Sequence, residues 1–259
     1  MLSAIHYRIS RTRLLSLLEE IKANSAEIAS LYIPPDSSQT TMERMLLNLA
    51  DVSPVLLDLK KSIAGSPTGA VVFWGPEHRY LVMPPFPINE EISSSSCDIE
   101  PLYTLLHREY LLGLVIVRLG AYGIGVYKGE TMLSSKAGTG LVHARHRQGG
   151  SSAHRFERHR DKQIEMFFTR VCSHIREQFE PYARQMDYII YGGTKETVLD
   201  FRKQCRFLQE FNKQTLDLLL NIREPKKSGL EEGIREAWSS RIIRWDNRQP
   251  SSGQLHSIE

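Results

Sequence analysis

The sequence is poor in cysteine, and the cysteines it has are not spaced as ligands. Its 259 residues include three, Cys97, Cys172 and Cys205, with no Cys-x-x-Cys or Cys-x-x-His pair. A disulfide framework needs an even set in a secretory context, and a zinc site needs paired ligands. We therefore expect structural or incidental thiols and no metal site. Hydrophobic residues at 41% and charged residues at 24% are typical of a globular protein and exclude collagen-like or wholly disordered chains.

Long apolar runs are also missing. The longest, Leu111 to Val117, is interrupted by Gly113 and ends at Arg118, whereas a bilayer span needs about 20 apolar residues. The first residues, MLSAIHYRISRTR, lack the apolar core of a signal peptide. These two observations predict a cytoplasmic protein without a membrane partner.

Common catalytic motifs do not occur. The sequence has no GxxxxGK[ST], HExxH or GxSxG, and its carboxylate pairs do not converge at a readable spacing. The glycine-rich string GAYGIGVYKG (120–129) lies between strand-like runs, so it indicates hairpin turns rather than a phosphate loop before a helix. We expect no cofactor.

The net positive charge of the chain lies in one short segment. Residues 143–162, HARHRQGGSSAHRFERHRDK, hold six Arg or Lys against two acids, a net charge of +4, while the whole chain is only +3. Four of the nine histidines also lie here, but Gly149–Gly150 separates them into two pairs, and the arginines between them would repel a metal ion. A local concentration of this kind indicates a polyanionic partner, and a phosphate backbone is the usual one.

The glycine pair inside this segment argues against a merely solvated helix face. Two adjacent glycines cost backbone entropy and are useful where the chain must move or approach a partner closely. Cations at a helix N-terminus are unfavourable because the macrodipole is already positive there. Basic residues flank Gly149–Gly150 on both sides, as a clamp on phosphates would.

Periodicity predicts alternating strands and helices, and hence an α/β fold. The long helix that follows Gly150 is expected to carry an apolar stripe from Ile164 to Phe179 and to end near Pro181. We expect a first domain over 1–109, a second over 110–246 and a disordered tail over 247–259. The other expected elements are helices over 10–32, 41–63 (interrupted at Pro54), 194–212 and 228–245, and strands at SLYIPP, 70–75, 79–88, LLGLVIVRL, YGIGVYKG, ETMLS, 138–147, MDYIIYGG and 216–222.

The string QGGSSAHRFERHR (148–160) resembles the GGQ-loop region of the class I peptide chain release factors of eukaryotes and archaea. The likeness is closer to the Vms-like release factors of ribosome-associated quality control, whose loop reads roughly Gln-Gly-Gly-Ser-Gln. DYIIYGG looks like the strand and turn that follow the long helix of the family. Upstream, SLYIPP, GAVVFWG, MPPFPI and the Cys97–Asp98 region are similar, in order, to landmarks of the release-factor N-terminal domain, so the resemblance covers about residues 10–245. The matching positions in the loop region are Gly149, Gly150, Ser152, Ala153, Arg155, Phe156, Arg158 and Arg160.

The resemblance implies a release-factor N-terminal-like α/β domain and a middle domain with a ribonuclease H-like mixed sheet and flanking helices. It implies a peptidyl-tRNA hydrolase that acts on stalled large ribosomal subunits, with their rRNA and peptidyl-tRNA as partners and no DNA, as a monomer. Asn-Ile-Lys-Ser and YxCxxxF are absent from the sequence, so we do not expect stop-codon reading.

The family glutamine is missing from its usual place. Ser151 stands where the class I factors have it, Ser152 where the Vms-like factors have it, and Gln148 precedes the glycines. We expect Gly149 and Gly150 to allow close approach to the tRNA 3′ end, the Ser151 N–H to stabilise an oxyanion, and Gln148 or Ser152 to orient water. The residues expected to bind RNA phosphates are Arg145, Arg147, His154, Arg155, Arg158, His159, Arg160 and Lys162.

Two other functions stay open at this point. The same fold occupies the ribosomal A site without catalysis in Pelota-type relatives that lack the motif, and the missing glutamine favours that alternative. Cleavage of the tRNA itself is a third possibility, although no acidic metal cluster supports it.

Overall fold

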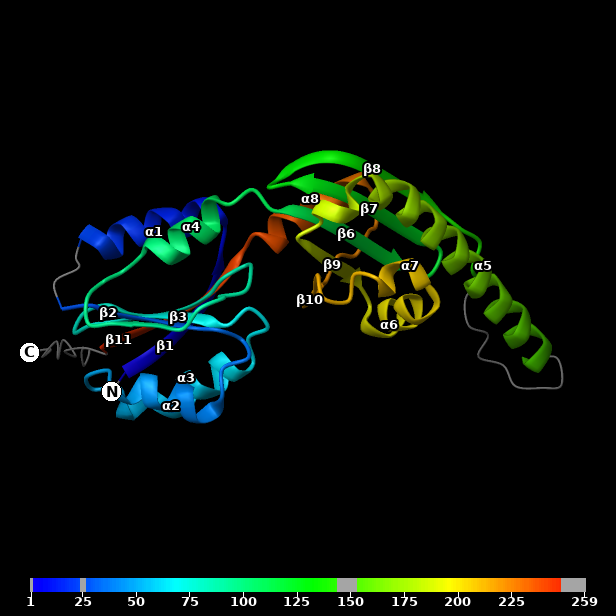
Figure 1. The fold of residues 1–259 in the computed structure, drawn as a ribbon. Helices are drawn as coiled ribbons and strands as arrows, with labels where there is room; N and C mark the ends of the chain where they lie inside the picture. Colours follow the sequence, from blue (N-terminus) through cyan, green and yellow to red (C-terminus); the bar gives the residue numbers. More distant parts are fainter. Residues whose placement is uncertain (1, 24–26, 144–152, 248–259) are drawn as a thin grey trace, which may run out of the picture. The chain divides into compact units, whose positions relative to one another are not determined.

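The computed structural model describes residues 2–23, 27–143 and 153–247 of the chain (Figure 1). They form two compact units: unit 1 comprises Met1–His107 and Ser239–Glu259, and unit 2 comprises Arg108–Trp238. Both units are α/β, in agreement with the expected fold class. Among the helices that the structure describes, none is long and apolar enough to cross a bilayer.

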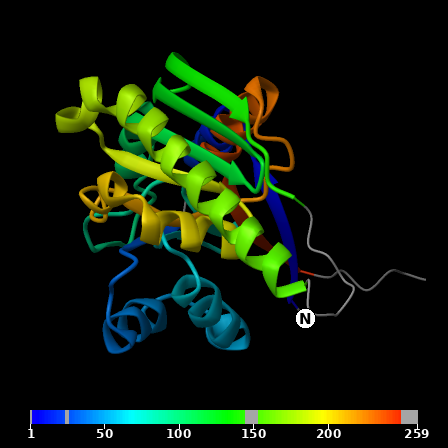
Figure 2. The ribbon, with the colours of Figure 1, turned by 90° about the vertical axis from the view of Figure 1, so that its right-hand side faces the viewer.

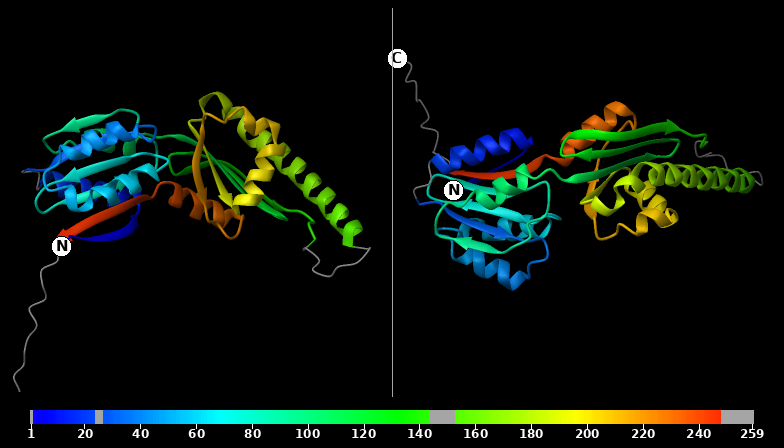
Figure 3. Two further views of the ribbon diagram at one scale, coloured as in Figure 1. Left: turned by 90° about the horizontal axis from the view of Figure 1, so that it is seen from below. Right: turned by 45° about the horizontal axis from the view of Figure 1, so that its top comes forward.

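Unit 1 is a six-stranded antiparallel sheet with helices on both faces. The strand order is β1-β11-β4-β3-β2-β5. Helices α2 and α3 pack on one face and α1 and α4 on the other (Figures 1 and 3). The elements are β1 Leu2–Ile9, α1 Arg11–Ala23, β2 Ala29–Ile33, α2 Gln39–Leu47, a 3₁₀ turn Ser53–Val55, α3 Leu56–Ala64, β3 Ala70–Trp74, β4 Arg79–Met83, β5 Ile92–Ser94, α4 Glu100–His107 and β11 Ser240–Asn247.

The expected helix 41–63 is divided where the sequence indicated. The Ser38 side chain caps the start of α2 by accepting from the Thr41 N–H at 3.1 Å. Pro54 lies in the 3₁₀ turn between α2 and α3, because proline cannot donate a hydrogen bond inside a helix.

The C-terminal part of the chain departs from the expectation. The helix expected over 228–245 stops at Ala237, and Ser240–Asn247 is strand β11, paired with β1 from Leu2↔Asn247 to Ile9↔Ser240. The domain expected to run to residue 246 therefore ends at Trp238, and β11 belongs to unit 1. Of the expected tail, Asn247 ends β11, and residues 248–259 lie outside the described part of the chain.

Unit 2 is built on a mixed sheet in the order β10-β9-β6-β7-β8. β6, β7 and β8 are antiparallel, whereas β9 runs parallel to β6 and β10, so the expected mixed sheet with flanking helices is confirmed. Its elements are β6 Leu111–Arg118, β7 Ala121–Lys128, β8 Thr131–Thr139, α5 Ala153–Phe179, a 3₁₀ turn Glu180–Gln185, β9 Tyr188–Gly193, α6 Lys195–Gln204, α7 Arg206–Gln209, β10 Thr215–Leu220 and α8 Lys227–Ala237.

The helices of unit 2 cover opposite faces of its sheet. Val115 and Val117 of β6 share a core with Phe168 of α5 and Phe201 of α6. Leu114, which alternation along the strand turns to the other face, lies against Gly233 of α8. Figure 2 shows α5 lying across the sheet. The expected apolar stripe of the long helix is the face that packs there.

Two details of unit 2 bear on the sequence interpretation. Gly120 and Gly129 have φ of 90° and 60° in the turns between β6, β7 and β8, so the glycine-rich string does form hairpin turns. Of the strand expected over 138–147, Gly138 and Thr139 end β8, residues 140–143 are not in a strand, and residues 144–147 lie outside the described residues.

Candidate functional site

The five residues expected to be catalytic lie outside the described residues, in the connection between β8 and α5. Residues 144–152 contain Gln148, Gly149, Gly150, Ser151 and Ser152, together with Arg145 and Arg147. The side chain of His154 is likewise outside the described part. The geometry of the site therefore comes from the two elements that this connection joins.

β8 and α5 lie side by side, and a series of polar contacts joins them. Ser134 donates to Gln178, the Lys136 Nζ lies 2.8 Å from the Glu177 Oε2, and an Arg170 Nη donates to the Thr139 carbonyl at 2.8 Å. The residue number rises along β8 as it falls along α5, so the two elements run in opposite directions and reach the same end of unit 2 (Figure 3). The end of β8 is thus held against α5, and the start of the connection lies beside the second and third turns of the helix.

The contact between Lys136 and Glu177 changes the pKa of the carboxylate. Lys136 and His174 both donate to the Glu177 carboxylate and hold its pKa below the usual value. The carboxylate is solvent-exposed, so the pair adds alignment between strand and helix more than it adds stability.

The last described residue before the connection is clamped by α5. The His143 N–H donates to the Gln163 Oε1 at 3.1 Å, and the Arg160 Nε donates to the His143 carbonyl at 3.0 Å. The His143 and His159 rings lie 6.3 Å apart between centroids. Both backbone polar groups of His143 therefore have partners on α5, so the chain enters the connection from a fixed position. We call Arg160 and Gln163 the His143 clamp.

Glycine is required just before the clamp. A Cβ on Gly140 would lie 2.6 Å from the Phe167 Cδ2 and would also meet the Arg170 guanidinium. Real Cβ atoms do not approach other atoms so closely, so the end of β8 lies tight against α5 only because residue 140 has no side chain.

The cations on the first turns of α5 are not distributed evenly around the helix. Arg155, Arg158, His159 and Lys162 follow spacings of 3, 4 and 7, which places them on one side of the helix. All four are exposed. At 3.6 residues per turn this side lies opposite Val171 and Ile175, which face the core. We call Arg155, Arg158, His159 and Lys162 the cationic stripe.

The acids of this stretch lie on the other side. Glu157 and Asp161 fall roughly opposite the cationic stripe by the same periodicity. The first turns of α5 thus present one strongly positive side. Arg160 also falls away from the stripe, which is why it reaches His143 and is less exposed than its neighbours.

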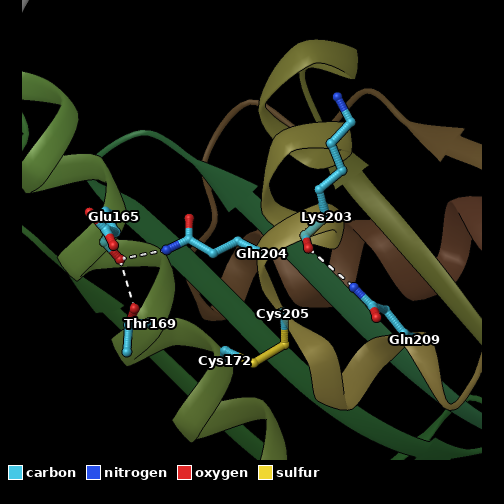
Figure 4. The surroundings of a disulfide bond; sticks show 7 residues. All are labelled: Glu165, Thr169, Cys172, Lys203, Gln204, Cys205 and Gln209. Atoms are coloured by element: carbon cyan, nitrogen blue, oxygen red, sulfur yellow. Dashed lines mark hydrogen bonds between the residues drawn. A yellow bond between two sulfur atoms is a disulfide. The ribbon is translucent and has the colours of Figure 1, made fainter.

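Helix α5 is braced in its second half by a disulfide. Cys172 of α5 and Cys205, between α6 and α7, are bonded, with their Cα atoms 5.5 Å apart (Figure 4). The expectation of three thiols is therefore wrong for this pair, and Cys97 is the one free cysteine among the described residues. The two cysteines are 33 residues apart, so only the packing of α6 against α5 reveals their proximity.

Neighbouring contacts strengthen the same junction. The Gln204 amide donates to the Glu165 carbonyl at 3.1 Å, the Phe168 and Phe201 rings meet edge to face at 5.3 Å, and the Arg176 guanidinium lies over the Phe207 ring. Figure 4 shows Gln204 and the disulfide bridging from the α6–α7 segment to α5. The helix that carries the cationic stripe is thus anchored over its second half.

Several residues of this arrangement were absent from the sequence interpretation. Gln163, Arg170 and the Lys136–Glu177 pair carried no motif, since their roles depend on where β8 lies relative to α5. The one sign of the clamp in the sequence is that Gln163 follows Arg160 by three residues, which places both on the same side of a helix.

Comparison with known proteins points to one class, the peptide chain release factors. The family model described as acVLRF1, Actinobacteria/chloroflexi VLRF1 release factor, matches residues 110–243, just over half of the chain. The chain belongs to this family of release factors.

More distant relatives cover both units. Peptide chain release factor subunit 1 of Archaeoglobus fulgidus is 27% identical over 254 residues, which cover 87% of this chain and 62% of that protein. The corresponding protein of Methanopyrus kandleri is 25% identical over 255 residues, 87% of this chain and 61% of that protein. The chain thus spans about three fifths of the length of these relatives.

Two solved structures are also similar to the chain. The archaeal translation termination factor aRF1 has a TM-score of 0.40 and 20% identity, over 88% of this chain and 70% of its own. The Vms1 mitochondrial localization core has a TM-score of 0.43 and 13% identity, over 85% of this chain and 98% of its own.

Proposed function

We propose that the protein rescues stalled ribosomes by hydrolysing peptidyl-tRNA on the large subunit, without reading a codon. The observation that carries the proposal is the position of the QGGSS segment. It joins two elements that the His143 clamp holds together, and it directly precedes a helix with a cationic stripe. Membership of a release factor family supports the reaction class. The protein acts in the cytoplasm, where its substrate is, and as a monomer.

In this proposal the stripe and the connection have separate tasks. Arg155, Arg158 and Lys162 bind phosphates of tRNA or rRNA, a sequence-independent contact that fixes position. Gly149 and Gly150 let the backbone approach the ester of peptidyl-tRNA, because no side chain stands in the way.

The chemistry is the attack of a water molecule on the ester carbonyl. The N–H of Ser151 donates to the oxyanion that develops, and Gln148 or Ser152 orients the water. Loss of one preorganised donor of this kind costs about 10²–10³ in rate. The serines at 151 and 152 therefore predict slower release than a glutamine in either place would give.

A second candidate function follows from the same substitution. With Ser151 and Ser152 in place of the family glutamine, the protein would occupy the ribosome and bind tRNA without hydrolysis, as Pelota-type factors do. The cationic stripe serves this function equally well, so only product analysis separates the two.

The test is release of labelled peptide from stalled complexes of large subunit and peptidyl-tRNA. We expect the wild-type protein to release peptide and leave intact tRNA, and Gly150→Ala to abolish release because a Cβ would block close approach. Gln148→Ala and Ser152→Ala then identify the group that orients water. Gly65→Ala, whose Cβ would make only ordinary contacts at 3.5 Å and beyond, is the matched control.

Two outcomes would contradict the proposal. Binding without any release by the wild-type protein would leave the non-catalytic factor, and release of shortened tRNA would indicate cleavage of the tRNA itself.

A further inference from the structure

Unit 1 has a cavity between the residues that follow helix α2 and one end of the strands β2, β3 and β5. Its volume is about 530 Å³, which is within the usual range for ligand sites. The floor is apolar, since Leu31 and Trp74 of the sheet and Leu49 after α2 are 1%, 3% and 5% exposed. Charged and hydroxyl side chains surround this floor, so the cavity combines an apolar base with a polar rim.

Two residues of the rim have an unusual backbone conformation. Glu27, just before β2, and Asp51, after α2, have φ of 69° and 53°. In the described part of the chain they are the two non-glycine residues with positive φ, and both line this cavity. A side chain makes this conformation unfavourable, and residues that keep it are concentrated at ligand and active sites. The coincidence indicates that both carboxylates are held at the rim for a ligand.

The negative charge of the rim is not neutralised by neighbouring side chains. Glu27 and Asp51 are exposed, and neither carboxylate has a hydrogen bond or an ion pair within the described residues. Arg79 is the cation of the cavity lining. It is 9% exposed and lies over the Trp74 ring, 5.7 Å from the centroid, so its charge is held at the floor. The mouth of the cavity therefore favours a cationic ligand and disfavours a phosphate.

One wall of the cavity is β5, the strand at the edge of the sheet. Ser93 pairs with Leu31, so its side chain lies on the cavity side of the sheet, and Ser94 and Ser95 also line the cavity. Among the strands that the structure describes, none pairs with the outer side of β5. An extended peptide can add to such an edge through backbone hydrogen bonds while its alternate side chains enter neighbouring pockets.

We propose that this cavity binds a lysine or arginine side chain of a partner protein, presented by an extended segment that pairs with β5. The cationic group lies between the Glu27 and Asp51 carboxylates, and the aliphatic part of the side chain lies on the apolar floor, as long cationic side chains do. The hydroxyls of Ser93 and Ser95 accept hydrogen bonds from its remaining donors. A free polyamine carries the same charge, but it has no backbone with which to pair with the edge of β5.

The test measures binding of short fluorescent peptides to the full chain by anisotropy. One peptide has a central lysine between threonine and valine residues, and the other has acetyllysine at that position, which removes the charge and keeps the length. We expect the lysine peptide to bind about tenfold more tightly, the usual effect of a charged hydrogen bond. Glu27→Gln with Asp51→Asn should abolish this preference by weakening binding of the lysine peptide alone. Asparagine tolerates the positive φ of residue 51.

Three controls separate the site from general charge and from misfolding. Glu19→Gln with Asp58→Asn removes two exposed carboxylates of unit 1 outside the cavity and is expected to keep the preference for lysine. Both double variants are expected to melt at the wild-type temperature, because none of the four carboxylates forms an ion pair within the described residues. A diazirine beside the lysine is expected to cross-link to residues 48–51 or 93–95.

Other outcomes would overturn the proposal. These are equal affinity for the lysine and acetyllysine peptides, and cross-links confined to unit 2. Spermidine that binds as tightly as the lysine peptide and displaces it would make the cavity a polyamine site, and displacement by an unstructured RNA would make it a nucleic-acid site. Since the assay contains no ribosome, its result does not depend on whether the protein releases peptide.

Discussion

Neighbouring arginines on α5 have different environments. Arg158 projects from the exposed cationic stripe, whereas Arg160 donates to the carbonyl of His143. In the sequence both belong to one basic run, and both were expected to bind RNA. The side of the helix on which each falls separates a phosphate contact from a group that holds the start of the connection.

We predict that the two arginines affect different kinetic constants. Arg160→Met should lower the rate of peptide release at saturating enzyme about tenfold and leave half-saturation nearly unchanged, because misplacing a reacting segment costs rate. Arg158→Met should raise half-saturation and reduce its salt dependence, with the maximal rate retained. Single-turnover release at several enzyme concentrations measures both constants.

A structural readout tests the clamp without the reaction. Gln163→Leu removes the acceptor of the His143 N–H, so the amide of His143 should exchange with solvent faster than in the wild-type protein. The prediction would be contradicted if Arg160→Met weakened ribosome binding and preserved the maximal rate. Arg160 would then belong with the RNA-binding residues.

At the scale of elements, the junction of α5 with the α6–α7 segment depends on the Cys172–Cys205 disulfide. We predict that Cys172→Ala, or reduction, lowers the free energy of unfolding by about 2–4 kcal/mol, the usual effect of closing a loop of this length. Denaturant unfolding with and without dithiothreitol measures the change. Cys97→Ala is the control, because Cys97 lies outside the bond.

Counting thiols decides whether the bond forms in the cell. The cytosol keeps most cysteines reduced. If protein is extracted under alkylating conditions, one labelled cysteine shows that the disulfide is formed in the cell, and three labelled cysteines show that the pair is reduced. Three labelled cysteines together with no effect of reduction on stability would contradict the bracing role.

Elements with local signals could be predicted from the sequence. The stripe from Ile164 to Phe179 defines α5, and Pro54 marks the division between α2 and α3. Ser240–Asn247 could not be predicted, because its strand state depends on pairing with β1, more than 230 residues away in the chain. The candidate catalytic segment could likewise be found from its sequence motif. The His143 clamp could not, because it depends on where β8 lies relative to α5.

For the whole molecule, the two units should differ in their response to mutation. β11 lies between β1 and β4, and its Trp245 is buried against Trp74 with ring centroids 5.8 Å apart. We predict that Trp245→Ala destabilises unit 1 by about 3–5 kcal/mol, while unit 2 keeps its stability. Calorimetry should show the first of two transitions moving to lower temperature.

The fluorescence of Trp238 gives an independent check, since it lies in unit 2 and its indole donates to the Gly129 carbonyl. In a Trp74→Phe, Trp245→Ala variant the remaining tryptophan reports unit 2 alone. A single cooperative loss of both units in this variant would contradict their independence.

The pairing of β1 with β11 also sets an order of events during synthesis. A ribosome makes β1 first and β11 last among the described elements, and unit 2 is the unbroken stretch between α4 and β11. When unit 2 has been synthesised in full, unit 1 still lacks β11, one of its inner strands. Unit 2 can therefore fold before the sheet of unit 1 is complete. Until Ser240–Asn247 leaves the ribosome, β4 has an open edge where β11 will pair, exposed to other nascent chains. A factor proposed to rescue stalled synthesis is thus itself vulnerable to a stall near its own C-terminal strand.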